Sequence, residues 1–206
     1  TDPDHIPTMR EVMSHTAGFA YGLFGDDPAN GMLRDQQIMQ SPDLDSFIDK
    51  VADVPLLFQP GTKWSYSASV DVQGYVIQKI SGVTLGEFLD TRLFVPLGMT
   101  DTGFYVPAED LDRFSDAFGY APDKPELGLV KYDTPTVQFR KETIAMESGG
   151  GGLVGTMDDY TRFCQMLLNG GELDGVRILK PETVELMRTN MLPDGAKLFS
   201  DGAQQN

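Results

Sequence analysis

Helix-start signals recur along the chain, and they constrain its fold more than any other feature. Thr8 and Glu11 have the spacing of a capping box, in which the threonine accepts from the third backbone N–H and the glutamate reaches back. Thr84 and Glu87 repeat this pattern, and Thr156 opens a similar segment. Apolar residues at helical spacing follow each signal. We therefore expect a chain in which helices dominate.

The expected helices begin near residues 8, 41, 67, 84, 156 and 181. Glycines and prolines would end the first five of them, namely Gly18, Pro55, Gly82, Pro96 and the run Asn169-Gly170-Gly171. Their inward faces would carry apolar side chains, among them Val12, Phe47, Val51, Val72, Tyr75, Val76, Ile80, Leu89, Tyr160, Phe163, Met166, Val184 and Met187. Cys164 falls among the inward positions of its helix, which predicts a buried structural thiol.

Strand signals are sparse. Residues 176–179 follow Asp174-Gly175, a pair typical of a hairpin turn. The segment 114–155 is rich in Pro, Gly and Asp, and we interpret it as long loops with two strands. A loop of that length in a folded domain is often functional.

Charge and composition exclude several classes of protein. The chain carries 16 basic and 31 acidic residues, a formal net charge of −15, and no basic cluster, so a nucleic-acid partner is not expected. Apolar runs such as Leu93–Met99 are far too short to span a membrane. One cysteine and two histidines exclude an internal disulfide and a Cys/His zinc site. We expect no metal and no cofactor, and neither the cytoplasm nor the periplasm is favoured.

The segment Pro60–Val72 is the most informative part of the chain. It places Tyr66 after a tight turn and at the entrance of an expected helix. A helix N-terminus carries partial positive charge, which favours a phenolate, whereas a free tyrosine titrates only near pH ~10. Alternatively, Tyr66 packs beside Trp64 and has only a structural role. On these residues alone, the structural interpretation is the stronger one.

Four segments in order carry a family resemblance. They read TMREVMSHTAGF (residues 8–19), PGTKWSYSASVDVQG (60–74), PLGMTDT (96–102), and a final stretch, 149–187, that contains GGGGLVGTMDDYTRFCQMLLNGG and LDGVRILKPETVELM. Together they resemble the serine β-lactamase-like hydrolases, a group that contains class C β-lactamases, DD-peptidases and family VIII carboxylesterases. Any one segment is weak, but four in the same order are specific.

The resemblance implies an α+β fold, in which a helical domain accompanies an antiparallel sheet flanked by helices. Residues 1–206 would be the central, largely helical part of a single catalytic unit, with most of the sheet and flanking parts missing at both ends. Tyr66 would be the catalytic tyrosine that exchanges a proton with the nucleophilic serine or the leaving group. Gly150 and Gly151 would form a turn beside the substrate. Ala68 takes the substrate-facing position that is asparagine in class C β-lactamases.

The nucleophile motif of this family, Ser-x-x-Lys, is not found in the 206 residues, because none of the lysines has a serine three positions before it. The chain also lacks Gly-x-Ser-x-Gly, so an α/β-hydrolase elbow is not supported. His5 and His15 fit no Ser-His-Asp order, and the His15 segment is interpreted as a helix end.

The expected function is that of a serine hydrolase acting on small carboxylic esters through an acyl-enzyme. Its partners would be a small ester substrate and the missing N- and C-terminal segments, and this chain alone would be inactive. A β-lactamase or DD-peptidase is one alternative, and a non-catalytic scaffold protein with the same fold is another.

Overall fold

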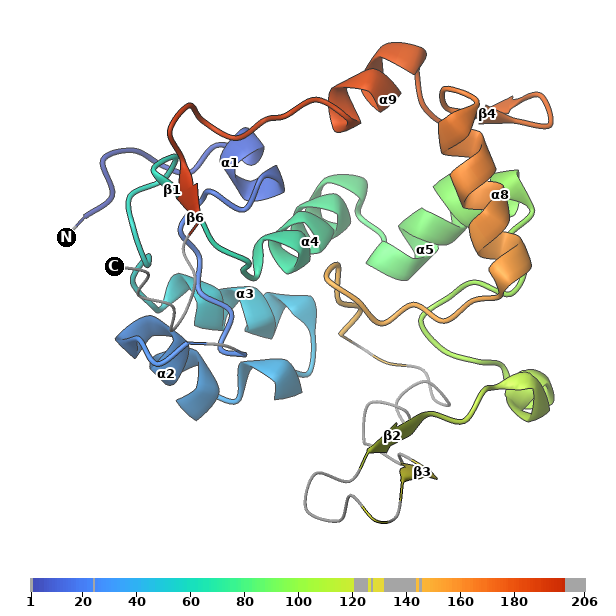
Figure 1. Ribbon diagram of the computed structural model, residues 1–206, viewed down its shortest axis with the longest axis horizontal. Helices are drawn as coiled ribbons and strands as arrows, with labels where there is room; N and C mark the ends of the chain where they lie inside the picture. The colour runs from blue at the N-terminus through green and yellow to red at the C-terminus, as the bar shows by residue number, and fades with distance from the viewer. Residues whose placement is uncertain are drawn as a thin grey trace.

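The computed structural model describes residues 2–23, 25–120, 126, 128–131, 144 and 146–198, with residues 197 and 198 described by their backbone only. Helices dominate this part of the chain, and short strand pairs accompany them (Figure 1). Two apolar clusters form its core, one among the first helices and one beside α8. Within the described ranges, no helix combines the length and the apolar character needed to cross a membrane.

The first part of the chain forms α1 (Met9–Met13), α2 (Pro28–Asp35), the 3-10 helix η1 (Ile38–Gln40) and α3 (Leu44–Ala52). The capping box of Thr8 and Glu11 is confirmed. However, α1 ends well before Gly18, because His15 takes a left-handed φ of 57° and the N–H of Thr16 turns back to the carbonyl of Glu11. The sequence did not indicate α2, which Asp27 caps.

These helices enclose the first apolar cluster. Its buried members are Ala20, Tyr21, Ala29, Leu33, Ile38, Phe47, Val51, Val54 and Ala68. Phe47 and Val51 are the residues that helical spacing placed inward, and they are buried as expected. The cluster therefore packs the start of the next long helix, to which Ala68 belongs as the N-cap, against α2 and α3.

A nearly continuous helical stretch follows, made of α4 (Ser69–Ser81), α5 (Leu85–Leu89), the π-helical η2 (Asp90–Phe94) and α6 (Val95–Leu97). Gly82 ends α4 with a φ of 75°, as predicted. Pro96 does not break the helix as expected, because the π-helical turn η2 leads directly into α6 and the helical stretch ends only at Gly98, which has a φ of 65°. The inward face predicted for α4 is also wrong at Ile80, which is 83% exposed.

The second cluster lies beside α8 (Met157–Leu168), followed by the hairpin β4 (Glu172–Leu173) and β5 (Val176–Arg177) and by α9 (Pro181–Met187). Its buried members are Phe94, Leu97, Met99 and Met166. The predicted hairpin is confirmed, with Asp174 and Gly175 both at positive φ. Cys164 is exposed, contrary to the prediction of a buried thiol, because it lies two residues, or about 200° of helix rotation, from the buried Met166. Tyr160 and Met187 are exposed as well, so their predicted inward placement is wrong.

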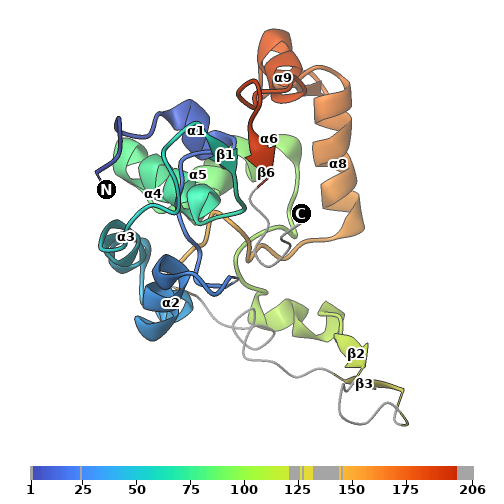
Figure 2. The same cartoon turned by 60° about the vertical axis from the view of Figure 1, so that its left-hand side comes forward.

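The remaining elements are short. The strand β1 (Lys63–Trp64) pairs in parallel with β6 (Lys197–Leu198), and β2 (Phe118–Tyr120) pairs antiparallel with β3 (Leu129–Lys131). The 3-10 helix η3 (Ala108–Arg113) precedes β2, and Figure 2 shows the β2–β3 pair projecting away from the helices. The strand pair expected within 114–155 is present, whereas residues 121–125, 127, 132–143 and 145 of that segment lie outside the described residues. Helices with small separate sheets agree with the predicted α+β class.

Candidate active site around Tyr66

Tyr66 lies in the short connection between β1 and α4, two residues before the N-cap of that helix. Its side chain is 45% exposed, although Ser65, Ser67 and Ala68 around it are all buried. The backbone of this segment is therefore held in the interior while one phenol reaches solvent.

The chain segment after α1 holds this connection in place through backbone hydrogen bonds. The N–H of Gly61 donates to Thr16 O at 2.9 Å, that of Ser65 to His15 O at 3.0 Å, and that of Ala68 to Ala20 O at 3.3 Å. These bonds hold residues 15–20 alongside residues 61–68. As a result, residues that follow the first helix become the immediate neighbours of Tyr66.

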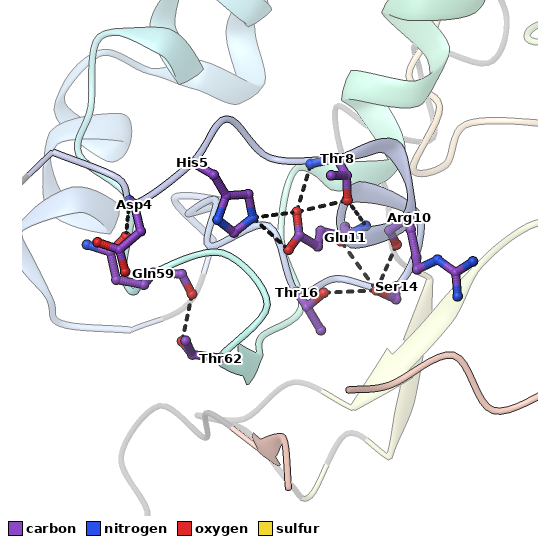
Figure 3. Close-up of polar contacts among 9 residues, drawn as sticks. All are labelled: Asp4, His5, Thr8, Arg10, Glu11, Ser14, Thr16, Gln59 and Thr62. Carbon is purple, nitrogen blue, oxygen red and sulfur yellow. Dashed lines mark hydrogen bonds and ion pairs between the residues drawn. The ribbon is translucent and has the colours of Figure 1, made fainter. Parts of the chain in front are cut away.

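The turn that precedes β1 is fitted closely against Glu11. Glu11 Oε2 accepts from Thr8 N at 2.7 Å, and its Oε1 lies 2.9 Å from His5 Nε2 (Figure 3). A Cβ on Gly61 would lie 2.8 Å from Glu11 Oε1, and Gly61 has a φ of +77°, so this position requires glycine. Burial raises the pKa of Glu11, but the bonds from Thr8 and His5 outweigh it and the pKa is lowered. The turn before Tyr66 thus packs closely against the polar start of α1.

Two aromatic rings flank the ring of Tyr66. His15 stacks on it, with 5.1 Å between ring centroids and an interplanar angle of 26°. Tyr21 meets it edge-on at 5.5 Å and 60°. Such offset and edge-to-face contacts are favourable and restrict how the phenol can turn. The ring of Tyr66 is therefore held between His15 and Tyr21, and its catalytic role stays a prediction.

A chain of hydroxyl groups connects His15 to the first turn of α4. His15 Nδ1 lies 3.2 Å from Ser67 Oγ, and Ser67 Oγ lies 2.8 Å from Ser69 Oγ. Burial lowers the pKa of His15, because the interior disfavours the imidazolium form. His15 is thus held by ring stacking on one side and a hydroxyl contact at Nδ1.

Asp71, in the first turn of α4, is 1% exposed and reaches across to a distant turn. Its Oδ1 accepts from Ser148 Oγ at 2.5 Å and from Gly150 N at 3.3 Å. Its Oδ2 is buried and accepts no hydrogen bond of standard geometry among the described residues. Burial raises the pKa of Tyr21 above its ordinary value, and the charge of Asp71 and a side-chain hydrogen bond to it act in the same direction.

The other predicted site residues take different places. Ala68 is fully buried in the first apolar cluster, so its methyl faces the core in this structure, and its contact with substrate stays a prediction. Gly150 is exposed, but its N–H is engaged by Asp71 Oδ1 and Ser148 Oγ. A Cβ on Gly151 would meet no atom within 4 Å. Gly150, but not Gly151, is thus linked by a described contact to Asp71 in the first turn of α4.

Sequence reasoning missed His15, Tyr21, Asp71 and Ser148 as neighbours of this site. For Asp71 the sequence held one usable signal. An acidic residue in the first turn of a helix is common, but a carboxylate on the buried side of that turn requires a partner from elsewhere in the fold. The other three have no local signal, since only the folded chain brings them to Tyr66.

A cavity in the described part of the chain lies away from Tyr66. It measures about 790 Å³ and is lined by parts of α5 and η3 and by residues 100–107 and 153–156, and Tyr66 is not among its lining residues. Glu147 joins the two regions, because its Oε2 accepts from Gly86 N at 2.6 Å on the wall of that cavity, next to Ser148. In the described part of the chain, no cluster of His, Cys, Asp and Glu is arranged to hold a metal.

Comparison with known proteins identifies the family. Residues 1–202 match the family model described as Beta-lactamase. Protein Rv1367c of Mycobacterium tuberculosis is 37% identical over 192 residues, which cover 93% of this chain and 46% of that protein. Esterase EstB of Burkholderia gladioli is 31% identical over 171 residues, which cover 76% of this chain and 43% of the esterase. The chain therefore spans less than half the length of these relatives.

Solved structures agree. The LovD6 mutant of simvastatin synthase (LovD) from Aspergillus terreus superimposes with a TM-score of 0.71 at 25% identity, over 91% of this chain and 41% of that one. EstCE1, described as a hydrolase with promiscuous acyltransferase activity, gives a TM-score of 0.69 at 27% identity, over 90% and 51%. The chain thus belongs to the β-lactamase family and has its penicillin-binding-protein-like fold, within a group of relatives that includes esterases and acyltransferases.

Proposed function

We propose that the protein containing this chain is a serine hydrolase that cleaves small carboxylic esters, with Tyr66 as a proton-transferring group. The observation that carries the proposal is the arrangement of Tyr66 itself. Its phenol reaches solvent from a buried backbone segment and is held between His15 and Tyr21. The resemblance to esterases supports the choice of ester chemistry.

The proposed reaction is acyl transfer in two steps. A serine from a Ser-x-x-Lys motif attacks the ester carbonyl, and its proton passes to Tyr66 in the phenolate form. The resulting phenol then protonates the departing alkoxide, which leaves as the alcohol and restores the phenolate. Water attacks the resulting acyl-enzyme in the second step, and the acid is released. This chain supplies the tyrosine and its surroundings, and the serine and lysine must come from sequence beyond the 206 residues given.

The proposed ester preference uses the resemblance, which places position 68 against the substrate, although the Ala68 methyl is buried in this structure. At this position an asparagine would offer an amide to a lactam side chain, whereas a methyl group offers neither donor nor acceptor. The lost hydrogen bond is worth about 1–3 kcal/mol, or roughly one to two powers of ten in rate, for a substrate that needs it. A simple ester has no amide to hold and loses nothing.

The test compares two substrates on the product of the complete open reading frame. We expect a short-chain nitrophenyl ester to be hydrolysed with a higher kcat/KM than nitrocefin. Higher kcat/KM with nitrocefin would replace the esterase proposal with a β-lactamase one. Activity on neither substrate, with no labelling by a serine-directed phosphonate, would favour the non-catalytic scaffold.

A second candidate is transfer of the acyl group to an alcohol instead of water, which the acyltransferase activity of EstCE1 favours. The same acyl-enzyme would serve both outcomes, so the nucleophiles compete in its second step. Adding a primary alcohol to the ester assay and measuring the new ester by chromatography distinguishes hydrolysis from transfer.

A further inference from the structure

Asp71 is a buried carboxylate whose charge is not explained by its visible hydrogen bonds. Both bonds, from Ser148 Oγ and Gly150 N, end on Oδ1 and anchor the turn of residues 148–150 to α4. The amide oxygen of an asparagine could accept the same two bonds without burying a charge. Burying a charge costs more than burying an amide, so anchoring the turn does not account for an aspartate here.

The second oxygen of Asp71 indicates where the charge acts. Oδ2 is buried and accepts no hydrogen bond of standard geometry among the described residues, and the Tyr21 hydroxyl is the donor beside it. A Cβ placed on Gly150 would lie 3.0 Å from this oxygen and 2.9 Å from the hydroxyl of Tyr21. Asp71 Oδ2 and the Tyr21 hydroxyl thus border the same glycine. The charge of Asp71 also contributes, after burial, to the raised pKa of Tyr21.

Tyr21 connects this charge to Tyr66. Its ring is 6% exposed and lies edge-on to the ring of Tyr66, at 5.5 Å between centroids. Tyr21 thus contacts the ring of Tyr66 on one side, and its hydroxyl lies beside Asp71 Oδ2 on the other.

We propose that Asp71 is a positioning residue for Tyr66. Its carboxylate lies beside the hydroxyl of Tyr21 and fixes the orientation of that ring against Tyr66, so that the Tyr66 phenol is held in one position for proton exchange. The glycine at position 150 lets the two oxygens approach. This proposal rests on the proposed function, because it assigns a role within that site.

The chain offers a matched control in Asp159. This residue also lies in the first turn of its helix, α8, is 5% exposed, and accepts two bonds on one oxygen, from Asp101 N and Thr102 Oγ1, each at 2.8 Å. It anchors a loop beside the second apolar cluster, where neither Tyr21 nor Tyr66 lies. Asp159→Asn therefore reproduces the structural part of Asp71→Asn without its proposed effect on the site.

The kinetic test uses the product of the complete open reading frame. We expect Asp71→Asn to lower kcat for ester hydrolysis about tenfold or more while KM changes less than about threefold, since a positioning effect acts on the chemical step. Asp159→Asn should leave kcat within about twofold while lowering Tm. If Asp71 acts through Tyr21, the double variant with Tyr21→Phe should lose no more than the larger single effect. Equal kcat losses for the two Asp→Asn variants, or fully additive losses in the double variant, would overturn the proposal.

A second measurement decides the proposal independently of activity. In protein labelled with ¹³C at tyrosine Cζ, the Tyr66 resonance is assigned from its absence in Tyr66→Phe. We expect this resonance to move in Asp71→Asn and to stay in place in Asp159→Asn. An unchanged resonance in Asp71→Asn would overturn the positioning role even in an active enzyme. An inactive wild-type protein would instead refute the proposed function and leave the resonance to decide the role of Asp71.

Discussion

The two apolar clusters of this protein differ in the polar groups buried beside them. Seven of the eight buried polar or charged side chains among the described residues lie in the first 71 positions, namely Thr16, Asn30, Ser41, Ser65, Ser67, Ser69 and Asp71. The region of α8 contains the eighth, Asp159. The two regions thus pack similar apolar cores but bury polar groups very unequally.

The difference separates stability from function. Asp159 holds a loop, and its accepting oxygen has two short bonds. Around Tyr66 the polar groups form a connected set that runs from His15 through Ser67 to Ser69, and beside it one oxygen of Asp71 accepts no hydrogen bond of standard geometry among the described residues. Buried polar groups are costly, and a concentration of them around one exposed phenol is typical of a functional site. We expect substitutions in the first region to affect catalysis and those in the second to affect stability.

The largest expected effect is that of Tyr66→Phe. In the product of the complete open reading frame, removing the hydroxyl should lower kcat about 10²–10⁴-fold with a smaller change in KM, because only the proton-transferring oxygen is lost. Tyr160→Phe is the control, since Tyr160 is a 61% exposed tyrosine on α8. Steady-state kinetics on a nitrophenyl ester checks both, and equal turnover by the two variants would abolish the distinction between the regions.

Next comes the turn at Gly150. Gly150→Ala should destabilise the protein by about 1–3 kcal/mol, because the added methyl would lie within 3.0 Å of the Tyr21 hydroxyl and Asp71 Oδ2. Gly151→Ala is the matched control, since its methyl would meet no atom within 4 Å. Urea unfolding of both variants measures the difference. Identical midpoints would show that the contact between Gly150, Tyr21 and Asp71 is looser than the structure has it.

A smaller effect is expected at Ala68. Ala68 is fully buried, so Ala68→Asn forces an amide into the first cluster and should cost about 1–2 kcal/mol of stability. Ala108→Asn, at an exposed position of η3, should cost less than about 0.5 kcal/mol. The ratio of nitrocefin to ester hydrolysis belongs in the same experiment. A stable Ala68→Asn protein with a raised ratio would mean that position 68 faces substrate in the whole protein.

The smallest expected effect is the pH dependence that His15 contributes. Burial lowers its pKa in the folded state, so the unfolded chain binds more protons as the pH falls below about 6.5, and this contribution to stability is lost there. His15→Asn removes the titration, and asparagine tolerates the left-handed backbone of this position. Wild type should lose more stability than the variant between pH 7.5 and pH 5. Glu11 contributes in the same direction but at lower pH, because its lowered pKa starts from the range of a carboxyl group. Parallel curves for the two proteins would contradict the effect.

Sequence signals predicted helix caps and turns well, because these features depend on residues close together in the chain. The caps at Thr8, Thr84 and Thr156 and the turn at Asp174-Gly175 are all present, because each depends on neighbours within a few residues. The face of α4 was predicted wrongly, since apolar spacing placed Ile80 inside. Its buried residues are instead Ser69, Asp71 and Gly74. A helix that buries polar groups needs partners from distant segments, and spacing alone does not reveal them.

The same reason limits what the sequence could say about the site. The position of Tyr66 at a helix entrance followed from the motif, but Asp71 meets Ser148 across 77 residues and His15 meets Ser67 across 52. His15 in particular resembled a helix end, and it does follow one. Its left-handed backbone then turns the chain so that its ring stacks on Tyr66.

The central claim is that Tyr66 acts on a serine nucleophile in an acyl-transfer site. Covalent labelling with a serine-directed fluorophosphonate tests it most directly, because the reagent reacts with an activated serine and its site is read by peptide mass spectrometry. For the product of the complete open reading frame we predict one equivalent of label on the serine of a Ser-x-x-Lys motif, at a rate about tenfold or more lower in Tyr66→Phe. The 206-residue chain by itself should take up none. Labelling at the wild-type rate in Tyr66→Phe, or stoichiometric labelling of the 206-residue chain, would contradict the account.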